Sequence, residues 1–291
     1  MLDLKSPTFE TARRVEARST PLRATLIGFG SIGSAVFDAF ASDPAIVVDQ
    51  IVVSPRSVAE TARRVGPAAT VASRVDALPG RPDIAIECAG HRAVREHVVP
   101  LLRMGVECAM VSIGALADDA VRDACEAAAL EGGGRVSLLS GAFGGLDALA
   151  AAAVGGLDDV LYTGSKPVEA WRGTPADAAG ALDGLRHAAT IFEGTARDTA
   201  QRYPKNANVA AAVALAGAGF ERTRVRLVAD PAAVRNTHVV RARGEFGELC
   251  IEIAATPCAR NPKTSALTAF SAIRFLRDRA RSGIGVMAAR P

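Results

Sequence analysis

Ala24-Thr-Leu-Ile-Gly-Phe-Gly-Ser-Ile-Gly33 decides the fold, because this stretch places three spaced glycines directly after an apolar run. In a strand–turn–helix unit of this kind, Gly28 permits the tight turn and Gly30 lets the backbone approach a pyrophosphate. Gly33 allows the helix to pack closely on the strand. The stretch therefore predicts a dinucleotide site. The alternative is a tight turn between strand and helix that binds no ligand.

The residues after this turn alternate between helix-like and strand-like patterns. Ser31 and Ile32 open a helical pattern, whose first N–H groups and partial positive charge suit phosphate. The predicted strands are Ala24–Phe29, Ile46–Val53, Asp83–Cys88, Val106–Ile113 and Arg135–Leu139. The predicted helices are Ile32–Ala41, Val58–Val65, Ala93–Met104 and Asp118–Glu131, the last ended by three glycines. This alternation predicts parallel strands with right-handed crossovers, and hence an α/β fold with a Rossmann-type, doubly wound parallel sheet.

The pattern changes after about Gly141, where several runs alternate apolar and polar residues as half-buried strands do. The predicted strands here are Leu157–Ser165, Thr223–Ala229, Asn236–Arg243 and Glu248–Ala255. The predicted helical regions are Ala178–Ala189, Thr195–Arg202 and Asn206–Ala218. We therefore expect a second, α+β domain with an open, mixed and largely antiparallel sheet and helices on one face.

The C-terminal segment Thr264–Arg281 has apolar residues at helical spacing, namely Leu267, Phe270, Ile273 and Leu276. We expect this helix to return and pack on the first domain. The predicted units are then an N-terminal extension over residues 1–20, a dinucleotide-binding domain over 21–140 plus 263–291, and a substrate, catalytic and oligomerisation domain over 141–262.

Composition excludes several classes of function. The net charge of +3 comes from 34 basic and 31 acidic residues spread along the chain, so no nucleic-acid partner is expected. The sequence contains no uninterrupted apolar run of about 18 residues, so no membrane helix is expected. The first 21 residues lack the apolar core of a secretory signal. The five cysteines are scattered and predict buried reduced thiols, no metal site and a cytoplasmic location.

The end of the second predicted strand bears on the choice of cofactor. It reads Val52-Val-Ser-Pro-Arg-Ser57 and lacks the acidic residue that grips the ribose hydroxyl in strict NAD enzymes. Ser54 and Arg56 offer donors instead, and Arg56 either pairs with a 2′-phosphate or is a solvated loop charge. The sequence thus permits NAD or NADP.

Two further turns are candidates to line a cofactor. Ala89 and Gly90 end another predicted strand, just before His91, which we interpret as a helix-start residue. The second glycine-rich turn, Ser140-Gly-Ala-Phe-Gly-Gly145, has small residues that would let a nicotinamide ring approach the backbone. The same turn also suits a hinge between domains, and the two interpretations are compatible.

Only one of the four histidines, His238, has polar neighbours useful for chemistry, since Arg235-Asn-Thr precedes it. An imidazole titrates near pH ~6.5 and can move protons near neutrality, so His238 is either a catalytic group or a hydrogen-bonded sheet histidine. The substrate-binding candidates are Lys205, Asn206, Lys263 and Thr264. Each could instead be a surface residue or a helix-start residue without a role in binding. Asn208 would meet a carboxamide or a substrate group from the first turn of a helix.

Five ordered motifs together resemble the L-aspartate dehydrogenase family. They are Lys166-Pro-Val-Glu-Ala-Trp-Arg-Gly-Thr-Pro175, Phe192-Glu-Gly-Thr-Ala-Arg197, Tyr203-Pro-Lys-Asn-Ala-Asn-Val209, Arg235-Asn-Thr-His238 and Asn261-Pro-Lys-Thr-Ser265. The resemblance implies oxidation of L-aspartate with NAD or NADP to iminoaspartate, which hydrolyses to oxaloacetate and ammonia or feeds NAD biosynthesis. It also implies His238 as the catalytic residue, nicotinamide contacts at Ala142 and Asn208, and a homodimer or larger assembly.

Two other functions stay open from the sequence. One is a different two-domain NAD(P)-dependent reductase, similar to dihydrodipicolinate reductase or homoserine dehydrogenase. The other is a non-catalytic NAD(P)-binding sensor. A panel of amino-acid and imine substrates would separate them.

Overall fold

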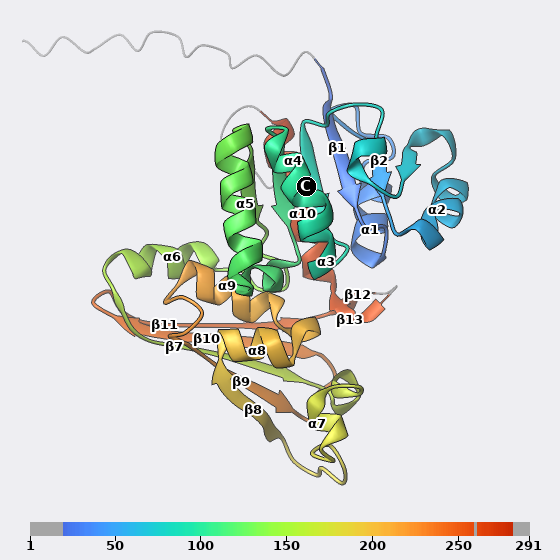
Figure 1. The fold of residues 1–291 in the computed structure, drawn as a ribbon. Coiled ribbons are helices and arrows are strands. Elements are labelled where there is room, and N and C mark those ends of the chain that lie inside the picture. The colour runs from blue at the N-terminus through green and yellow to red at the C-terminus, as the bar shows by residue number, and fades with distance from the viewer. Residues whose placement is uncertain (1–19, 259–260, 282–291) are drawn as a thin grey trace, which may run out of the picture.

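The computed structural model describes residues 20–258 and 261–281, and Figure 1 shows their arrangement as two sheets with helices packed between and around them. The predicted N-terminal extension lies almost entirely outside the described residues, as does the end of the C-terminal segment beyond residue 281. Within the described part, no helix is long and apolar enough to cross a membrane.

The first sheet is parallel and has six strands in the order β3-β2-β1-β4-β5-β6. This is the strand order of a Rossmann sheet, so the predicted fold class is confirmed. Its strands are β1 (Leu22–Ile27), β2 (Ile46–Val52), β3 (Thr70–Ala72), β4 (Ile84–Glu87), β5 (Glu107–Met110) and β6 (Arg135–Leu138). Only β3 was not predicted, because three residues are too few to form a recognisable pattern.

The predicted helices of the first half all form. They are α1 (Ser31–Ala39), α2 (Val58–Val65), α3 (His91–Ala93) continued by a π-helical turn (Val94–Val98) and α4 (Val99–Arg103), and α5 (Asp119–Gly132). The π turn ends two residues before Pro100, which has no N–H to donate back along the helix. Asp118 caps α5 by accepting from the N–H of Ala120 at 3.0 Å, and Gly133 ends it with φ +69°.

The second sheet has five strands in the order β11-β10-β7-β9-β8, and only the β7–β9 pair is parallel. Its strands are β7 (Leu157–Lys166), β8 (Ala189–Thr195), β9 (Thr223–Ala229), β10 (Asn236–Gly244) and β11 (Gly247–Ala255). The expectation of a mixed, largely antiparallel sheet is confirmed, although β8 was not predicted. A short hairpin of β12 (Pro257–Cys258) and β13 (Asn261–Ser265) follows.

The helices of this half are α6 (Leu146–Val154), α8 (Ala196–Arg202) and α9 (Asn208–Ala216), with the short α7 (Pro175–Ala178) at the edge. They pack on the second sheet, and two of them, α8 and α9, also contact residues 113–117 of the first half. The predicted helical region 178–189 is wrong, because Gly180 and Gly184 adopt φ of +71° and +66° and turn the chain after α7.

The start of α9 also differs from the sequence-based alternative that Asn206 is a helix-start residue. A 3-10 turn over Pro204–Asn206 precedes the helix, and Ala207 is the N-cap. Asn206 is therefore not the helix cap. Its side chain instead accepts a hydrogen bond from Lys166, at 2.5 Å.

The last helix, α10 (Ala266–Ala280), returns to the first sheet as predicted and packs beside α1 (Figure 1). Its buried face runs through Ala269, Ala272 and Leu276. Phe270, expected on that face, is 61% exposed. Leu276 is buried as predicted and Ile273 packs against the same core, so the prediction fails at Phe270.

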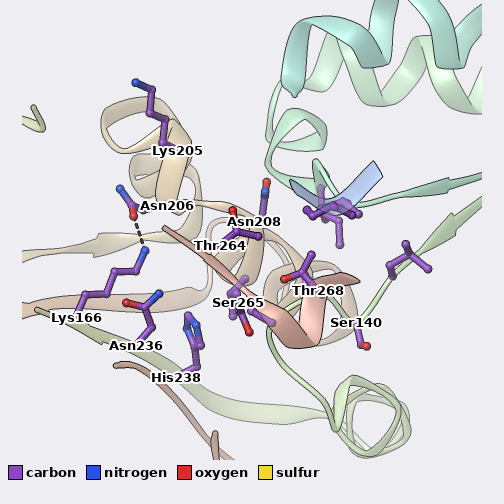
Figure 2. A pocket seen from close by; sticks show the side chains of 18 residues that line it. Ser140, Lys166, Lys205, Asn206, Asn208, Asn236, His238, Thr264, Ser265 and Thr268 are labelled. Atoms are coloured by element: carbon purple, nitrogen blue, oxygen red, sulfur yellow. Dashed lines mark hydrogen bonds between the residues drawn. The ribbon is translucent and has the colours of Figure 1, made fainter. Parts of the chain in front are cut away.

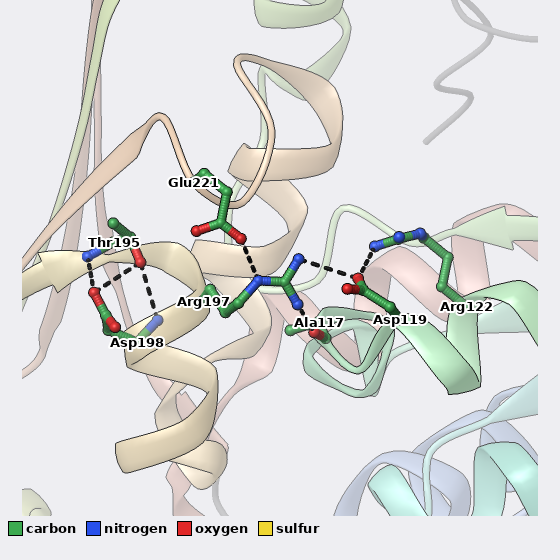
Figure 3. A network of polar contacts seen from close by, with 7 residues as sticks. All are labelled: Ala117, Asp119, Arg122, Thr195, Arg197, Asp198 and Glu221. Carbon is green, nitrogen blue, oxygen red and sulfur yellow. Dashed lines mark hydrogen bonds and ion pairs between the residues drawn. The ribbon is translucent and has the colours of Figure 1, made fainter.

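Arg197, at the start of α8, joins the two halves of the molecule (Figure 3). Its guanidinium donates to the carbonyl of Ala117, to Asp119 at 3.0 Å and to Glu221. Ala117 and Asp119 lie just before and at the start of α5 in the first half, whereas Arg197 and Glu221 belong to the second. One side chain therefore connects both halves by charge-assisted hydrogen bonds.

The five cysteines are free, but the expectation that they are buried is only partly right. Cys108 and Cys125 are buried, Cys88 and Cys258 are partly buried, and Cys250 is exposed. Cys250 lies on β11, the edge strand of the second sheet, where alternate side chains face solvent.

Candidate functional site

The first glycine-rich turn has the geometry that its sequence predicts. Gly28 adopts φ +100°, and a Cβ there would lie 2.8 Å from the backbone of Ala89. A Cβ on Gly33 would lie 2.2 Å from the carbonyl oxygen of Gly28, so only glycine fits between α1 and β1. A Cβ on Gly30 would meet no atom within 4 Å. The middle glycine thus faces open space, as an approaching pyrophosphate requires.

The N-terminus of α1 fits an anion. Gly30 is the N-cap, and no side chain in the described part of the chain caps the helix. The first N–H groups, at Ser31, Ile32 and Gly33, are the ones that such a helix leaves for a bound phosphate. Their charge and the open space at Gly30 fit a dinucleotide pyrophosphate.

Ser54 and Arg56 lie in the exposed loop after β2. The Ser54 hydroxyl lies 3.0 Å from that of Ser57. Asp49, the acidic residue of β2, forms an ion pair with Arg23 at 2.8 Å. The loop therefore presents hydroxyl and guanidinium donors where a strict NAD enzyme has a carboxylate.

Glu87, at the end of β4, is fully buried beneath the Ala89–Gly90 turn and was not among the predicted site residues. Its carboxylate accepts from the N–H groups of Ala89 and Gly90, both at 2.9 Å, and from the N–H and hydroxyl of Ser112. Burial raises the pKa of Glu87 despite these four donors. The side chain fixes the loops after β4 and β5 to each other.

A cavity of about 160 Å³ opens where the carboxyl ends of the first sheet meet the second sheet (Figure 2). Its lining comes from α1, the loops after β5 and β6, the strands β7 and β10, the start of α9 and the start of α10. Residues far apart in the chain thus surround one space.

The cavity gathers seven of the predicted site residues, namely Ile32, Ala142, Lys205, Asn206, Asn208, His238 and Thr264. Eight others lie outside its lining: Gly28, Gly30, Ser31 and Gly33 in the first turn, Ser54 and Arg56 after β2, and Ala89 and Gly90 after β4. Lys263 belongs to β13, but its side chain lies outside the described part of the structure.

His238 lies on β10 opposite Gly164 of β7, and only 4% of its surface is exposed. Burial, together with the nearby charge of Lys166, lowers the pKa of His238 to about 4. The imidazole is therefore neutral at pH 7 and able to accept a proton.

Tyr162, on β7, is the hydrogen-bond partner of His238 and was not predicted. Its hydroxyl lies 2.8 Å from Nδ1 of His238, and the two rings stack with centroids 6.0 Å apart. Gly164 makes room for this contact, since a Cβ there would lie 2.6 Å from the tyrosine hydroxyl. Because Nδ1 is engaged, Nε2 is the ring nitrogen left for a substrate.

Lys166, at the end of β7, also lines the cavity and was missed as a site residue. Its ammonium donates to Oδ1 of Asn206 at 2.5 Å and lies 5.2 Å from the centre of the Trp171 ring. Desolvation lowers the pKa of Lys166 to about 8. Lys205, one of the two lysines that were predicted, is exposed at the rim.

Asn208 connects the site to the first half of the molecule. Its Oδ1 accepts from the N–H of Gly114 at 3.0 Å and lies 3.4 Å from Nε2 of His91. A Cβ on Gly114 would collide with both side chains, so the close approach depends on that glycine. The amide NH₂ of Asn208 remains as a donor toward a carboxamide or a substrate oxygen.

Two protein-family models match the chain. Residues 147–279 match the model described as aspartate dehydrogenase, C-terminal. Residues 28–139 match the model described as homoserine dehydrogenase, NAD binding domain. The two matches meet close to the point where the first sheet ends and the second begins.

Similar proteins cover nearly the whole chain. It is 52% identical to the L-aspartate dehydrogenase of Cupriavidus necator, over 90% of this chain and 98% of that protein. The identity to the L-aspartate dehydrogenase of Pseudomonas aeruginosa is 46%, with the same coverage. The solved structure of aspartate dehydrogenase from Thermotoga maritima superposes with a TM-score of 0.71 at 26% identity, over 90% of this chain and 98% of that one.

Proposed function

The chain belongs to the L-aspartate dehydrogenase family, and from this premise we propose how its site works. The enzyme oxidises L-aspartate with NAD or NADP to iminoaspartate, which hydrolyses to oxaloacetate and ammonia. The observation that best supports this reaction is the neutral, buried His238, held by Tyr162 in a cavity that also contains a lysine. In reverse, the same site performs reductive amination, and the imine is available to NAD biosynthesis.

His238 is the acid–base residue of this proposal. With Nδ1 bound to the Tyr162 hydroxyl, Nε2 takes a proton as the amine of the substrate becomes an imine, and returns one in the reverse direction. The low pKa of His238 keeps the ring unprotonated before the substrate binds. Burial also holds the ring in one orientation, which favours proton transfer over a short distance.

NAD or NADP fits the residues of the first half. The N–H groups of Ser31, Ile32 and Gly33 would hold the pyrophosphate, with Gly30 leaving room for it. Ala89, Gly90, Ala142 and Asn208 would line the remainder of the cofactor. A bound dinucleotide would supply the nicotinamide ring as acceptor for the hydride from the substrate Cα.

Tolerance of both cofactors follows from the loop after β2. Ser54 would hydrogen-bond a ribose hydroxyl, and the exposed Arg56 would pair with a 2′-phosphate. The dissociation constants of NAD and NADP, measured for the wild-type protein and for Arg56→Ala, test this assignment. An equal effect on both cofactors would mean that Arg56 does not touch the 2′-phosphate.

In this proposal one half of the molecule binds the cofactor and the other binds the substrate. Residues 21–140 with 263–291 bind the dinucleotide, and residues 141–262 provide the substrate site and the contacts of a homodimer. Lys205, Asn206, Lys263 and Thr264 are the proposed substrate-binding residues, because Lys205, Asn206 and Thr264 line the cavity and Lys263 adjoins Thr264. Light scattering of the purified protein would determine the number of subunits.

A substrate panel tests the function. The purified protein is expected to form NADH or NADPH from L-aspartate, and to consume it with oxaloacetate plus ammonia. Turnover of homoserine or of a dihydrodipicolinate instead would assign the site to another reductase. A folded sample that binds dinucleotide without turning over any substrate would point to a sensor.

A further inference from the structure

Lys166 is a cation whose neighbours are neutral. Its ammonium contacts the amide of Asn206 and the face of Trp171, and among the described residues it forms no ion pair with a carboxylate. The strands around it are otherwise rich in paired charges, such as Arg224 with Asp159 and Arg226 with Glu193. A partly buried ammonium in a cavity, whose partners are an amide and an aromatic ring, is a site for an anion from outside the chain.

The position of Lys166 on its strand relates it to the catalytic histidine. Gly164 lies opposite His238, and Lys166 is two residues further along β7, on the same face of the strand. In the view of Figure 2, His238 lies between Lys166 and Ser140, which belongs to the second glycine-rich turn. Lys166 is thus at the end of the cavity away from the first sheet.

This order along the cavity determines which part of the substrate reaches Lys166. The carbon that loses the hydride must lie beside His238 and face the first sheet, where the dinucleotide binds. The side-chain carboxylate of aspartate is separated from that carbon by a methylene group and extends beyond it. It is the anionic group able to reach the far end of the cavity.

We infer that Lys166 binds the side-chain carboxylate of the substrate and thereby selects a dicarboxylic amino acid over its amide or a shorter amino acid. The inference rests on the proposed function and adds the residue that recognises the substrate. Binding would exchange or supplement the bond to the uncharged Asn206 amide with an ion pair, in which the carboxylate adds Coulombic attraction to the hydrogen bond. Asn236, 8% exposed and lining the same end of the cavity, is placed to donate its amide to the same carboxylate.

A structural role is the alternative for Lys166, because its bond to Asn206 ties β7 to the turn before α9. Two substitutions separate the roles. Lys166→Gln retains an NH₂ that can donate to Asn206 but removes the charge, whereas Lys166→Met removes both. Under a structural role Lys166→Gln behaves like the wild type, and under the proposed role it behaves like Lys166→Met.

The experiment compares L-aspartate with L-asparagine, whose side chain differs by replacement of the carboxylate with an amide. For both variants, kcat/KM for L-aspartate is expected to fall by about 10²–10³-fold, mostly through KM, as for loss of a charge pair. The low kcat/KM for L-asparagine should change by less than about threefold, so that the preference for aspartate collapses. Equal losses on both substrates, or no loss, would overturn the inference.

Two further measurements complete the test. Arg74→Met, which removes an exposed cation outside the cavity, is the control, and its kcat/KM for L-aspartate should stay at the wild-type value. The dissociation constant of NAD or NADP should stay within about twofold in every variant.

Binding of succinate and succinamate to the dinucleotide-loaded protein gives a readout that is independent of turnover. Lys166→Met should weaken succinate binding by about 10²-fold and leave succinamate binding nearly unchanged. If the wild-type protein did not oxidise aspartate, the proposed function would fail, and this comparison would still decide the role of Lys166. Unchanged succinate binding in Lys166→Met would refute that role.

Discussion

At the scale of single residues, His238 is the side chain on which turnover should depend most. His238→Ala is expected to lower kcat by about 10²–10⁴-fold, the range for loss of a positioned acid–base group. The affinity for NAD or NADP should be retained, because the glycine-rich turn lies on the other sheet. Steady-state kinetics and a dinucleotide titration measure the two quantities. Near-normal turnover would mean that another group or water carries the proton.

The pH dependence of kcat/KM reports the protonation of His238. Because burial and Lys166 lower the pKa of His238 to about 4, the free enzyme keeps a neutral imidazole as the pH falls through 6.5. The acid limb of kcat/KM is therefore expected between about pH 4 and 5, since activity is lost only when the ring gains a proton. Lys166→Met removes a nearby positive charge and should move this limb upward. An acid limb near pH 6.5 in the kcat/KM profile of the wild-type enzyme would contradict the burial of the ring.

Tyr162 is a positioning residue, since it acts on the substrate only through His238. Tyr162→Phe leaves the buried Nδ1 without its 2.8 Å partner, which should cost about 1–3 kcal/mol of folding free energy. We expect kcat to fall by about tenfold with little change in KM for aspartate, because the ring loses its fixed orientation. Tyr203→Phe is the matched control, because Tyr203 is also buried but does not line the cavity. Equal kcat values for the two variants would show that the hydroxyl of Tyr162 does not orient the histidine.

At the scale of elements, the turn between β1 and α1 separates packing from ligand binding. Gly33→Ala places a methyl group 2.2 Å from the carbonyl oxygen of Gly28 and should cost about 1–3 kcal/mol of stability. Gly30→Ala meets nothing within 4 Å, so stability should hold while dinucleotide affinity falls by tenfold or more, because the methyl group occupies the pyrophosphate space. Urea unfolding measures the stability of both variants, and fluorescence titration measures their affinity for the dinucleotide. A reversed pattern would refute the assignment of these two glycines.

At the scale of the whole molecule, Arg197 connects the two halves. Arg197→Met removes its bonds to Ala117, Asp119 and Glu221, and should lower the free energy of unfolding by about 1 kcal/mol. Added salt should shrink the difference from the wild type, because much of it is electrostatic. Arg74→Met, which removes a local exposed pair with Asp76, is the control and should show no measurable change. The same small effect in both variants would mean that Arg197 does not stabilise the contact between the halves.

The sequence by itself determined the parallel sheet, the glycine-rich turn and the return of α10. These features depend on local patterns, since the period of apolar residues and the positions of glycine specify a strand, a turn or a helix over a few residues. His238 was also singled out from the sequence as the candidate acid–base residue, because its polar neighbours adjoin it in the chain. The helix predicted over 178–189 failed for a local reason as well, since two glycines at positive φ there outweigh the alanines.

Only the tertiary structure decided the partners of the site. Tyr162 is 76 positions from His238 and Lys166 is 40 positions from Asn206, so no periodicity in the sequence relates them. Their contacts arise from the register of β7 against β10 and from the packing of the turn before α9 above that sheet. Burial then determines the chemistry. Loss of the surrounding water lowers the pKa of His238 and that of Lys166, and this loss occurs only when the chain folds.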